Sequence, residues 1–223
     1  MKKITVISIT ILFLSTVISF GQEFKVQLPP GYNIIMNSDD LTGKEGSQYL
    51  AEQFLPGTIK LYNGKMIHDL TYRYNVYKYE MQYKLGDKIY IIGTPDSLQN
   101  IVIADKKFIY TAFATGNRTG KTYFEISVDG SVKLLIRYYI MVTKANYDVV
   151  HDIGNKMDQL ELKESYFILK DNHTFEIDKK GKSIFGLFPN NQKEISDFMK
   201  SNKLSFGKIT DLIPLVNFCN TLQ

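Results

Sequence analysis

The sequence predicts a mainly β (α+β) fold, an antiparallel meander or barrel-like sheet with two C-terminal helices. Three observations predict it. Apolar and polar residues alternate over short segments from about Thr58 to Phe188, which is the period of strands. Turn dipeptides, Asn63-Gly64 and Asp129-Gly130, separate some of these segments and favour tight hairpins. From about residue 190 the apolar spacing becomes helical.

The predicted organisation has four parts. They are a signal peptide (residues 1–21), an irregular entry segment (22–55), an antiparallel β domain (56–189) and a helical pair packed on the sheet (190–223). Removing the first part leaves 202 residues, enough for one substantial domain or two small ones.

The first residues have the layout of a secretory signal peptide. Lys2 and Lys3 precede an apolar run that ends at Phe20, and small residues stand at −3 and −1 of a cut before Gln22. The run is shorter than the ~20 residues that a spanning helix needs. No cysteine lies near the cut, which argues against a lipoprotein. We therefore expect a periplasmic or secreted protein with no transmembrane segment after cleavage.

The stretch from Tyr72 to Lys84 is the most informative part of the predicted sheet. Its apolar residues change parity near Tyr77, and side chains alternate faces along a strand. A bulge or tight turn there therefore makes two strands, or one sharply bent strand. Further strands are predicted at 58–62, from 65 on, and at 88–92, 101–104, 107–113, 121–128, 132–142, 166–169, 175–177 and 184–188.

The connections between these strands carry turn and loop signals. Thr94-Pro95 interrupts the sheet, and residues 96–100 are predicted as a helical turn or loop. Residues 114–120 are predicted as a loop, and residues 171–173 as a hairpin turn. Residues 143–161 are weakly patterned and predict a long loop, a lid or a disordered tip.

Two amphipathic helices are predicted at the C-terminus. The first has Asn191 as its N-cap and Glu194 in a capping-box position, with Ile195 on its apolar face. The second starts at Thr210, and its apolar side includes Cys219. The helices are expected to cover one face or edge of the sheet.

Composition excludes several classes of protein. The formal net charge falls from +4 to +2 when Lys2 and Lys3 leave with the signal peptide. This balance is too mild to indicate a nucleic-acid partner.

The single cysteine, Cys219, cannot form an internal disulfide, and we expect it to be a buried small apolar group. The fold must then be held together by burial, for which 44% hydrophobic residues suffice.

No motif in the chain predicts a cofactor or a metal. Residues 116–122, GNRTGKT, resemble a phosphate-binding loop, but the glycine spacing is short and a strand pattern follows where a helix is needed. The histidines, His68, His151 and His173, are scattered, whereas zinc needs three or four converging ligands. No Gly-x-Ser-x-Gly hydrolase elbow is present.

The tyrosine-rich strands around residue 75 are the candidate binding feature. Tyrosines give flat apolar faces with hydrogen-bonding ends, which suit sugars, peptides or partner proteins. The alternative is a sheet core whose tyrosine hydroxyls reach the rim. The candidate binding residues are Tyr72, Arg73, Tyr74, Asn75, Tyr79 and Glu80.

The same region carries a family resemblance. Its residues are Phe54, Gly57, Asn63-Gly64, Arg73-Tyr74-Asn75 and Glu80-Met81. Through these residues, the segment 46–84 resembles a group of uncharacterised exported proteins of Bacteroidetes, especially flavobacteria. The resemblance extends more loosely through Lys107-Phe108, the 123–130 hairpin and the terminal helix with Asn217 and Leu222. It implies a compartment and a taxon, and no activity.

We therefore expect a non-enzymatic binding or interaction protein of the cell envelope, with an envelope protein or a glycan as partner and no cofactor. The alternative is a glycan- or peptide-acting hydrolase whose carboxylates meet across the sheet. A cleft holding two carboxylates ~5–10 Å apart would favour that alternative.

Overall fold

The computed structural model describes residues 33–34 and 41–222 of the 223-residue chain. The predicted signal peptide, residues 1–21, and the entry segment up to residue 32 lie outside the described residues, as do residues 35–40. Within the described ranges, no helix combines the length and the apolar character that crossing a membrane requires.

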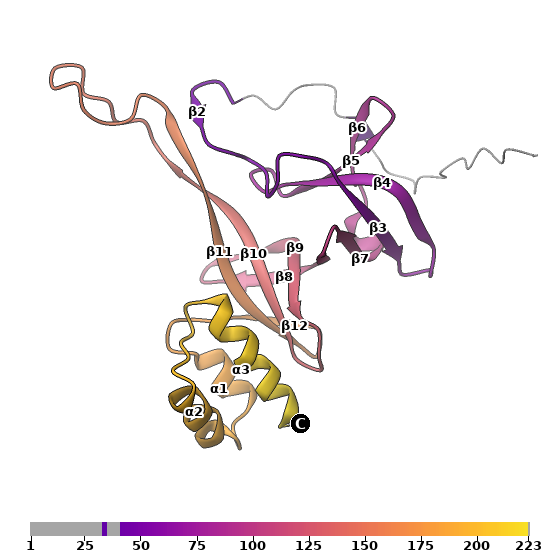
Figure 1. The fold of residues 1–223 in the computed structure, drawn as a ribbon, viewed down its shortest axis with the longest axis vertical. Helices are drawn as coiled ribbons and strands as arrows, with labels where there is room; N and C mark the ends of the chain where they lie inside the picture. The colour runs from indigo at the N-terminus through magenta and orange to yellow at the C-terminus, as the bar shows by residue number, and fades with distance from the viewer. Residues whose placement is uncertain (1–32, 35–40, 223) are drawn as a thin grey trace, which may run out of the picture.

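Strands dominate the described chain and form one mostly antiparallel open sheet (Figure 1), which confirms the predicted mainly β fold class. The first half of the sheet is a meander of β3 (Leu55–Leu61), β4 (Met66–Asn75), β5 (Glu80–Leu85) and β6 (Lys88–Ile91), with β1 (Asn33–Ile34) paired to β6 at the edge.

The second half is another meander that runs to the opposite edge. It contains β7 (Leu98–Ile103), β8 (Lys106–Thr115), β9 (Arg118–Val128), β10 (Lys133–Thr143), β11 (Asp158–Lys170) and β12 (His173–Glu176). A short 3₁₀ turn, η1 (Pro95–Ser97), leads into β7, as the interruption at Thr94-Pro95 predicts. The predicted turn or loop at 96–100 is shorter than expected, because residues 98–100 already belong to β7. β2 (Lys44–Glu45) pairs in parallel with the outer end of β11.

Strand β3 joins the two meanders because it pairs with β4 on one side and with β7 on the other. A β-bulge interrupts its pairing with β4 between Gly57 and Ile59, and Asp69 on the facing strand has a positive φ of 62°. The bulge lets Ile67 and Leu70, three residues apart, both point into the core.

The predicted turns are found where the dipeptides indicate them. Asn63-Gly64 links β3 to β4 and Asp129-Gly130 follows β9. Residues 76–79 form the turn that divides the tyrosine-rich stretch into β4 and β5, so the parity argument is confirmed.

Two further predicted loops are shorter than expected. The strands β8 and β9 extend through most of residues 114–120, leaving a two-residue turn with Gly116 at a φ of 55°. The segment that resembles a phosphate loop is therefore part of a β-hairpin. The predicted 143–161 loop is reduced to residues 144–157, because β10 and β11 stay paired out to Thr143 and Gln159.

The main core lies between the two meanders. The ring of Tyr74 on β4 lies 6.1 Å from the ring of Phe108 on β8 and 5.6 Å from that of Tyr123 on β9, centroid to centroid. Tyr72, Met81 and Tyr83 are each at most 1% exposed in the same cluster. The first meander is thus folded over the second.

A smaller aromatic cluster lies on the opposite face of the second meander. Phe124, Leu135 and Phe167 are fully buried there, and Phe113 packs against them. The sheet curls around this cluster until Thr174 of β12 donates a hydrogen bond of 2.8 Å to the carbonyl oxygen of Ala112 on β8. The curl resembles a barrel, while the sheet as a whole stays open.

The C-terminal region contains both predicted helices, α2 (Gln192–Ser201) and α3 (Ile209–Thr221), together at one end of the sheet (Figure 1). Their apolar faces pack with Val128, Leu134 and Ile168 of the strands. Asn191 is the N-cap residue of α2, but its side chain makes no capping hydrogen bond. Cys219 is buried, as predicted, and burial raises the pKa of its thiol to about 11.

The prediction of a strand at 184–188 is wrong, because residues 184–187 belong to a third helix, α1 (Lys182–Leu187), and Phe188 is its C-cap residue. A short apolar run does not by itself distinguish strand from helix. The Asp178 carboxylate accepts hydrogen bonds from the backbone N–H groups of Lys180 and Lys182, and so supports the helix start. Ile184 and Phe188 are then buried one helical turn apart.

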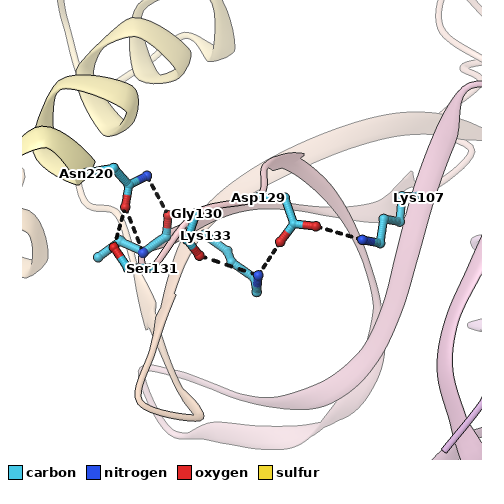
Figure 2. A network of polar contacts seen from close by, with 7 residues as sticks. Lys107, Asp129, Gly130, Ser131, Lys133 and Asn220 are labelled. Carbon is cyan, nitrogen blue, oxygen red and sulfur yellow. Dashed lines mark hydrogen bonds and ion pairs between the residues drawn. The ribbon is translucent and has the colours of Figure 1, made fainter.

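Asn220 fastens the end of α3 to the β9–β10 turn (Figure 2). Its side-chain oxygen accepts hydrogen bonds from the Val132 N–H at 2.8 Å and the Ser131 hydroxyl at 2.9 Å, and its amide donates to the Val132 carbonyl at 2.9 Å. On the other side of this turn, the Asp129 carboxylate binds Lys107 and Lys133. The same turn therefore ties together β8, β10 and α3.

We expect Asn220→Ala to lower the free energy of unfolding by about 1–3 kcal/mol, because it removes three hydrogen bonds and leaves the partly buried Val132 N–H unsatisfied. Urea unfolding followed by circular dichroism measures the change. Asn202→Ala is the control, since Asn202 is an exposed residue whose amide bonds only the Phe198 carbonyl of its own helix. Equal effects of the two variants would contradict the role assigned to Asn220.

Candidate functional site

The structure separates the six candidate residues between the two faces of the β4–β5 hairpin. Tyr72 and Tyr74 lie on the inner face, 0% and 2% exposed, within the main core. Asn75 is also buried, on the outer face, whereas Arg73 and Glu80 are half-buried. Tyr79, in the turn, is 39% exposed and has a positive φ of 57°. The six residues therefore do not form one exposed surface.

Arg73 holds the segment before β3 against the hairpin. Its guanidinium stacks 3.6 Å from the ring centroid of Tyr49 and 4.5 Å from that of Phe54. It also donates two hydrogen bonds, of 2.8 and 3.2 Å, to the side-chain oxygen of Gln82, which is 1% exposed. The planar, delocalised guanidinium suits both contacts at once.

Asn75 makes a second attachment for the same segment. It donates a 3.3 Å hydrogen bond to the side-chain oxygen of buried Gln48, and its own oxygen accepts one from the Lys78 N–H in the turn. The backbone of Gln48 also accepts hydrogen bonds from the Val76 and Tyr77 N–H groups. Asn75 thus shapes the turn and fixes the entry of the chain.

A cavity of about 140 Å³ lies where this segment meets β4, β7 and β8, and we call it the β4–β8 cavity. Tyr72, Arg73 and Tyr74, three of the six candidates, line it together with Phe108 and Ile103. Leu50, Ala51, Gln53 and Leu55 complete the wall on the entry side, and Ala104, Asp105 and Lys106 at the β7–β8 turn complete the opposite side. The lining is mainly apolar, with two cationic side chains and one carboxylate.

The ammonium group of Lys106, on the β7–β8 side of the cavity, is held in a fixed position. Lys106 donates a 2.7 Å hydrogen bond to Glu125, and the Tyr138 hydroxyl donates one of 2.6 Å to the same carboxylate oxygen. Burial raises the pKa of Tyr138, and the Glu125 carboxylate raises it further, so Tyr138 stays a neutral donor. The Lys106 side chain, 40% exposed, is thereby positioned at the cavity.

Sequence reasoning did not identify Leu50, Ile103 or Lys106 as site residues. They lie more than 20 residues from Tyr72 in the chain. The sheet order β4-β3-β7-β8 brings Ile103 and Lys106 to the cavity, and a hydrogen bond of 3.0 Å from the Leu50 N–H to the Tyr74 carbonyl places Leu50 there. No local pattern marks such a meeting of strands. The remaining candidates, Asn75, Tyr79 and Glu80, are not among the residues that line the cavity.

The three histidines lie in different parts of the structure. His68 faces the Thr58 hydroxyl in an open groove beside the β3–β4 bulge, while His151 and His173 lie in the β10–β11 connection and at the start of β12. Among residues 33–34 and 41–222, no three His, Cys, Asp or Glu side chains group closely enough to hold a metal ion.

Comparison with known proteins does not place this chain in a family. No family model, no curated protein and no solved structure matches it.

Proposed function

We propose that this protein is a non-catalytic binding protein of the cell envelope, and that the β4–β8 cavity takes one apolar group of its ligand. The observation that carries the proposal is the cavity itself. An apolar cavity of about 150 Å³ in another protein binds benzene, and the volume here is about 140 Å³. The cavity therefore suits one aromatic ring or one branched aliphatic side chain.

The charged residues of the cavity lining indicate a second chemical feature of the ligand. Arg73 and Lys106 are cationic, and Asp105 is the carboxylate. Because Lys106 is already paired with Glu125, the Arg73 guanidinium is the cation of the lining that favours an apolar group with a carboxylate close by. A side chain next to an acidic residue, or a short organic acid, has this chemistry.

The lining supports binding better than hydrolysis. A glycosidase pair needs two carboxylates facing one cleft, whereas Asp105 is the one carboxylate among the described residues that line the cavity. Glu125 lies nearby, but it is engaged by both Lys106 and Tyr138. The second candidate function, a glycan- or peptide-acting hydrolase, would need a measured turnover of such a substrate.

Titration with 3-phenylpropionate, followed by NMR of the backbone amides, tests the proposal. We expect a Kd on the order of 1 mM, from ~0.4 kcal/mol per non-hydrogen atom. Amide shifts should concentrate at residues 50–55 and at the β7–β8 turn, and the uncharged 3-phenylpropanamide should bind a few-fold more weakly.

Two Ala→Trp substitutions, one in the cavity wall and one away from it, make the test specific. Ala51→Trp fills the cavity and should abolish binding, whereas Ala114→Trp, at an exposed position of β8, should leave it unchanged. Binding that survives Ala51→Trp, or no shift at ~10 mM ligand, a tenfold excess over the expected Kd, would contradict the proposed site.

A further inference from the structure

The most exposed apolar side chains gather at one place, the connection between β10 and β11. We call residues 144–157 the tip. Val150, Val149 and Ile153 are 86%, 79% and 63% exposed, and they are three of the four most exposed large apolar side chains in the described part of the chain. Scattered exposed apolar residues are ordinary, but a cluster on one projecting element indicates an interaction site.

The tip projects at the far end of the β10–β11 hairpin, which we call the arm (Figure 1), beyond the point where β2 pairs with Asp158 and Gln159 of β11. Strand β9 pairs with β10 only along residues 134–136, whereas β10 and β11 continue together to Thr143 and Gln159. The arm therefore extends well past the rest of the second meander and presents the tip to other molecules.

Hydrogen bonds hold the tip in one conformation. Asp148 N–H donates to the Ile153 carbonyl at 2.8 Å, and Asn146 N–H donates to the Asn155 carbonyl at 3.0 Å. The Asp148 carboxylate accepts hydrogen bonds from the Val150 N–H and from the His151 ring. A preformed loop loses little conformational entropy on binding, which favours insertion into a site.

The charges beside these apolar side chains favour a protein site over a lipid bilayer. Asp148 and Asp152 flank the two valines in sequence. The hydrogen bond from His151 and those from the backbone hold the pKa of Asp148 below its ordinary value, so it is ionised at neutral pH. Inserting the valines into hydrocarbon would draw both carboxylates out of water, which is unfavourable.

We propose that the tip of one copy of this chain docks into the β4–β8 cavity of a second copy. The cavity takes one branched apolar side chain and has the Arg73 guanidinium in its lining, while the tip presents Val149 and Val150 between two carboxylates. The apolar groups match in size, and the Arg73 cation suits the carboxylates beside the valines. The inference rests on the proposed function, because it names the ligand of that same cavity.

The contact joins two different surfaces, so it is heterologous and leaves a free tip and a free cavity on each pair. Copies then add head to tail. The contact area is small, and interfaces well below 1,000 Å² are weak and transient. We expect a Kd on the order of 100 µM.

Sedimentation velocity of the purified protein from about 10 µM to about 1 mM tests the inference across the expected Kd. The sedimentation coefficient should rise with concentration beyond that of a dimer. The double variant Val149→Ser, Val150→Ser and the variant Ala51→Trp should each stay monomeric. Tyr62→Ser changes a side chain that is 71% exposed in the β3–β4 turn, and should associate like the wild type.

A mixture of the two monomeric variants is the sharper test. The tip variant keeps its cavity and the Ala51→Trp variant keeps its tip, so the mixture should associate again and stop at a dimer. A mixture that stays monomeric, or a wild type that stays monomeric throughout, would overturn the inference. So would a wild type that floats with vesicles of phosphatidylethanolamine and phosphatidylglycerol through its valines.

The two proposals fail in different ways. If 3-phenylpropionate binds the cavity while the wild type stays monomeric, the tip is not the ligand and the binding function stands. If association persists in Ala51→Trp while the acid does not bind, the cavity itself is not a binding site, and both proposals are overturned.

Discussion

Gly57→Ala is expected to lower the free energy of unfolding by about 3 kcal/mol, at the upper end of the range for overpacked cores. A Cβ atom at position 57 would lie 2.4 Å from the carbonyl oxygen of Val102 and 2.7 Å from the ring of Tyr72. Neither neighbour can yield easily, since Val102 is part of β7 and Tyr72 is fully buried. The strand that joins the two meanders would have to shift.

Urea unfolding measures this effect, and the same substitution elsewhere provides the control. Gly186 is exposed in α1, and a Cβ atom there would meet nothing within 4 Å. Gly186→Ala should therefore be neutral or stabilising by up to about 1 kcal/mol, the difference in helix propensity. A Gly57→Ala protein as stable as the wild type would show that β3 does not hold β4 and β7 as closely as described.

Phe167→Ala is expected to cost about 3–5 kcal/mol, because a buried aromatic side chain is lost and a cavity is left behind. Phe167 is fully buried on β11, and its ring lies edge-to-face with Phe124 at 5.1 Å and with Phe113 at 6.5 Å. These rings fill the inside of the curl of the second meander. Their loss would loosen β8, β9 and β11 together.

The matched control for this variant is Phe175→Ala on the neighbouring strand β12. Phe175 is 38% exposed, so we expect a loss of at most about 1 kcal/mol, as for other partly exposed positions. Phe167→Leu keeps most of the buried volume and should fall between the two alanine variants. Similar midpoints of urea unfolding for Phe167→Ala and Phe175→Ala would contradict the assignment of this cluster to the core.

Much of the local structure was predictable because it depends on neighbouring residues. The parity change near Tyr77 predicted the turn between β4 and β5, and the residues at 63–64 and 129–130 predicted two further turns. Helical spacing after residue 190 predicted α2 and α3. The run at 184–188 was assigned to a strand instead of a helix, because five residues are too few to separate the two periods.

The candidate site was predicted only in part. Tyr72, Arg73 and Tyr74 do line the β4–β8 cavity, but alternation alone does not say which face of a strand is covered. The stacking of Arg73 on Tyr49 likewise depends on a contact with the segment before β3.

The sequence by itself determined the kinds of element and most of their turns, since alternation, helical spacing and turn residues act over a few neighbouring positions. Only the tertiary structure decided that β3 lies between β4 and β7, that residues 50–55 and Lys106 meet at one cavity, and that Val149 and Val150 project on an arm. Pairing between distant strands decides these features, and it depends on burial summed over the whole sheet, which no local pattern records.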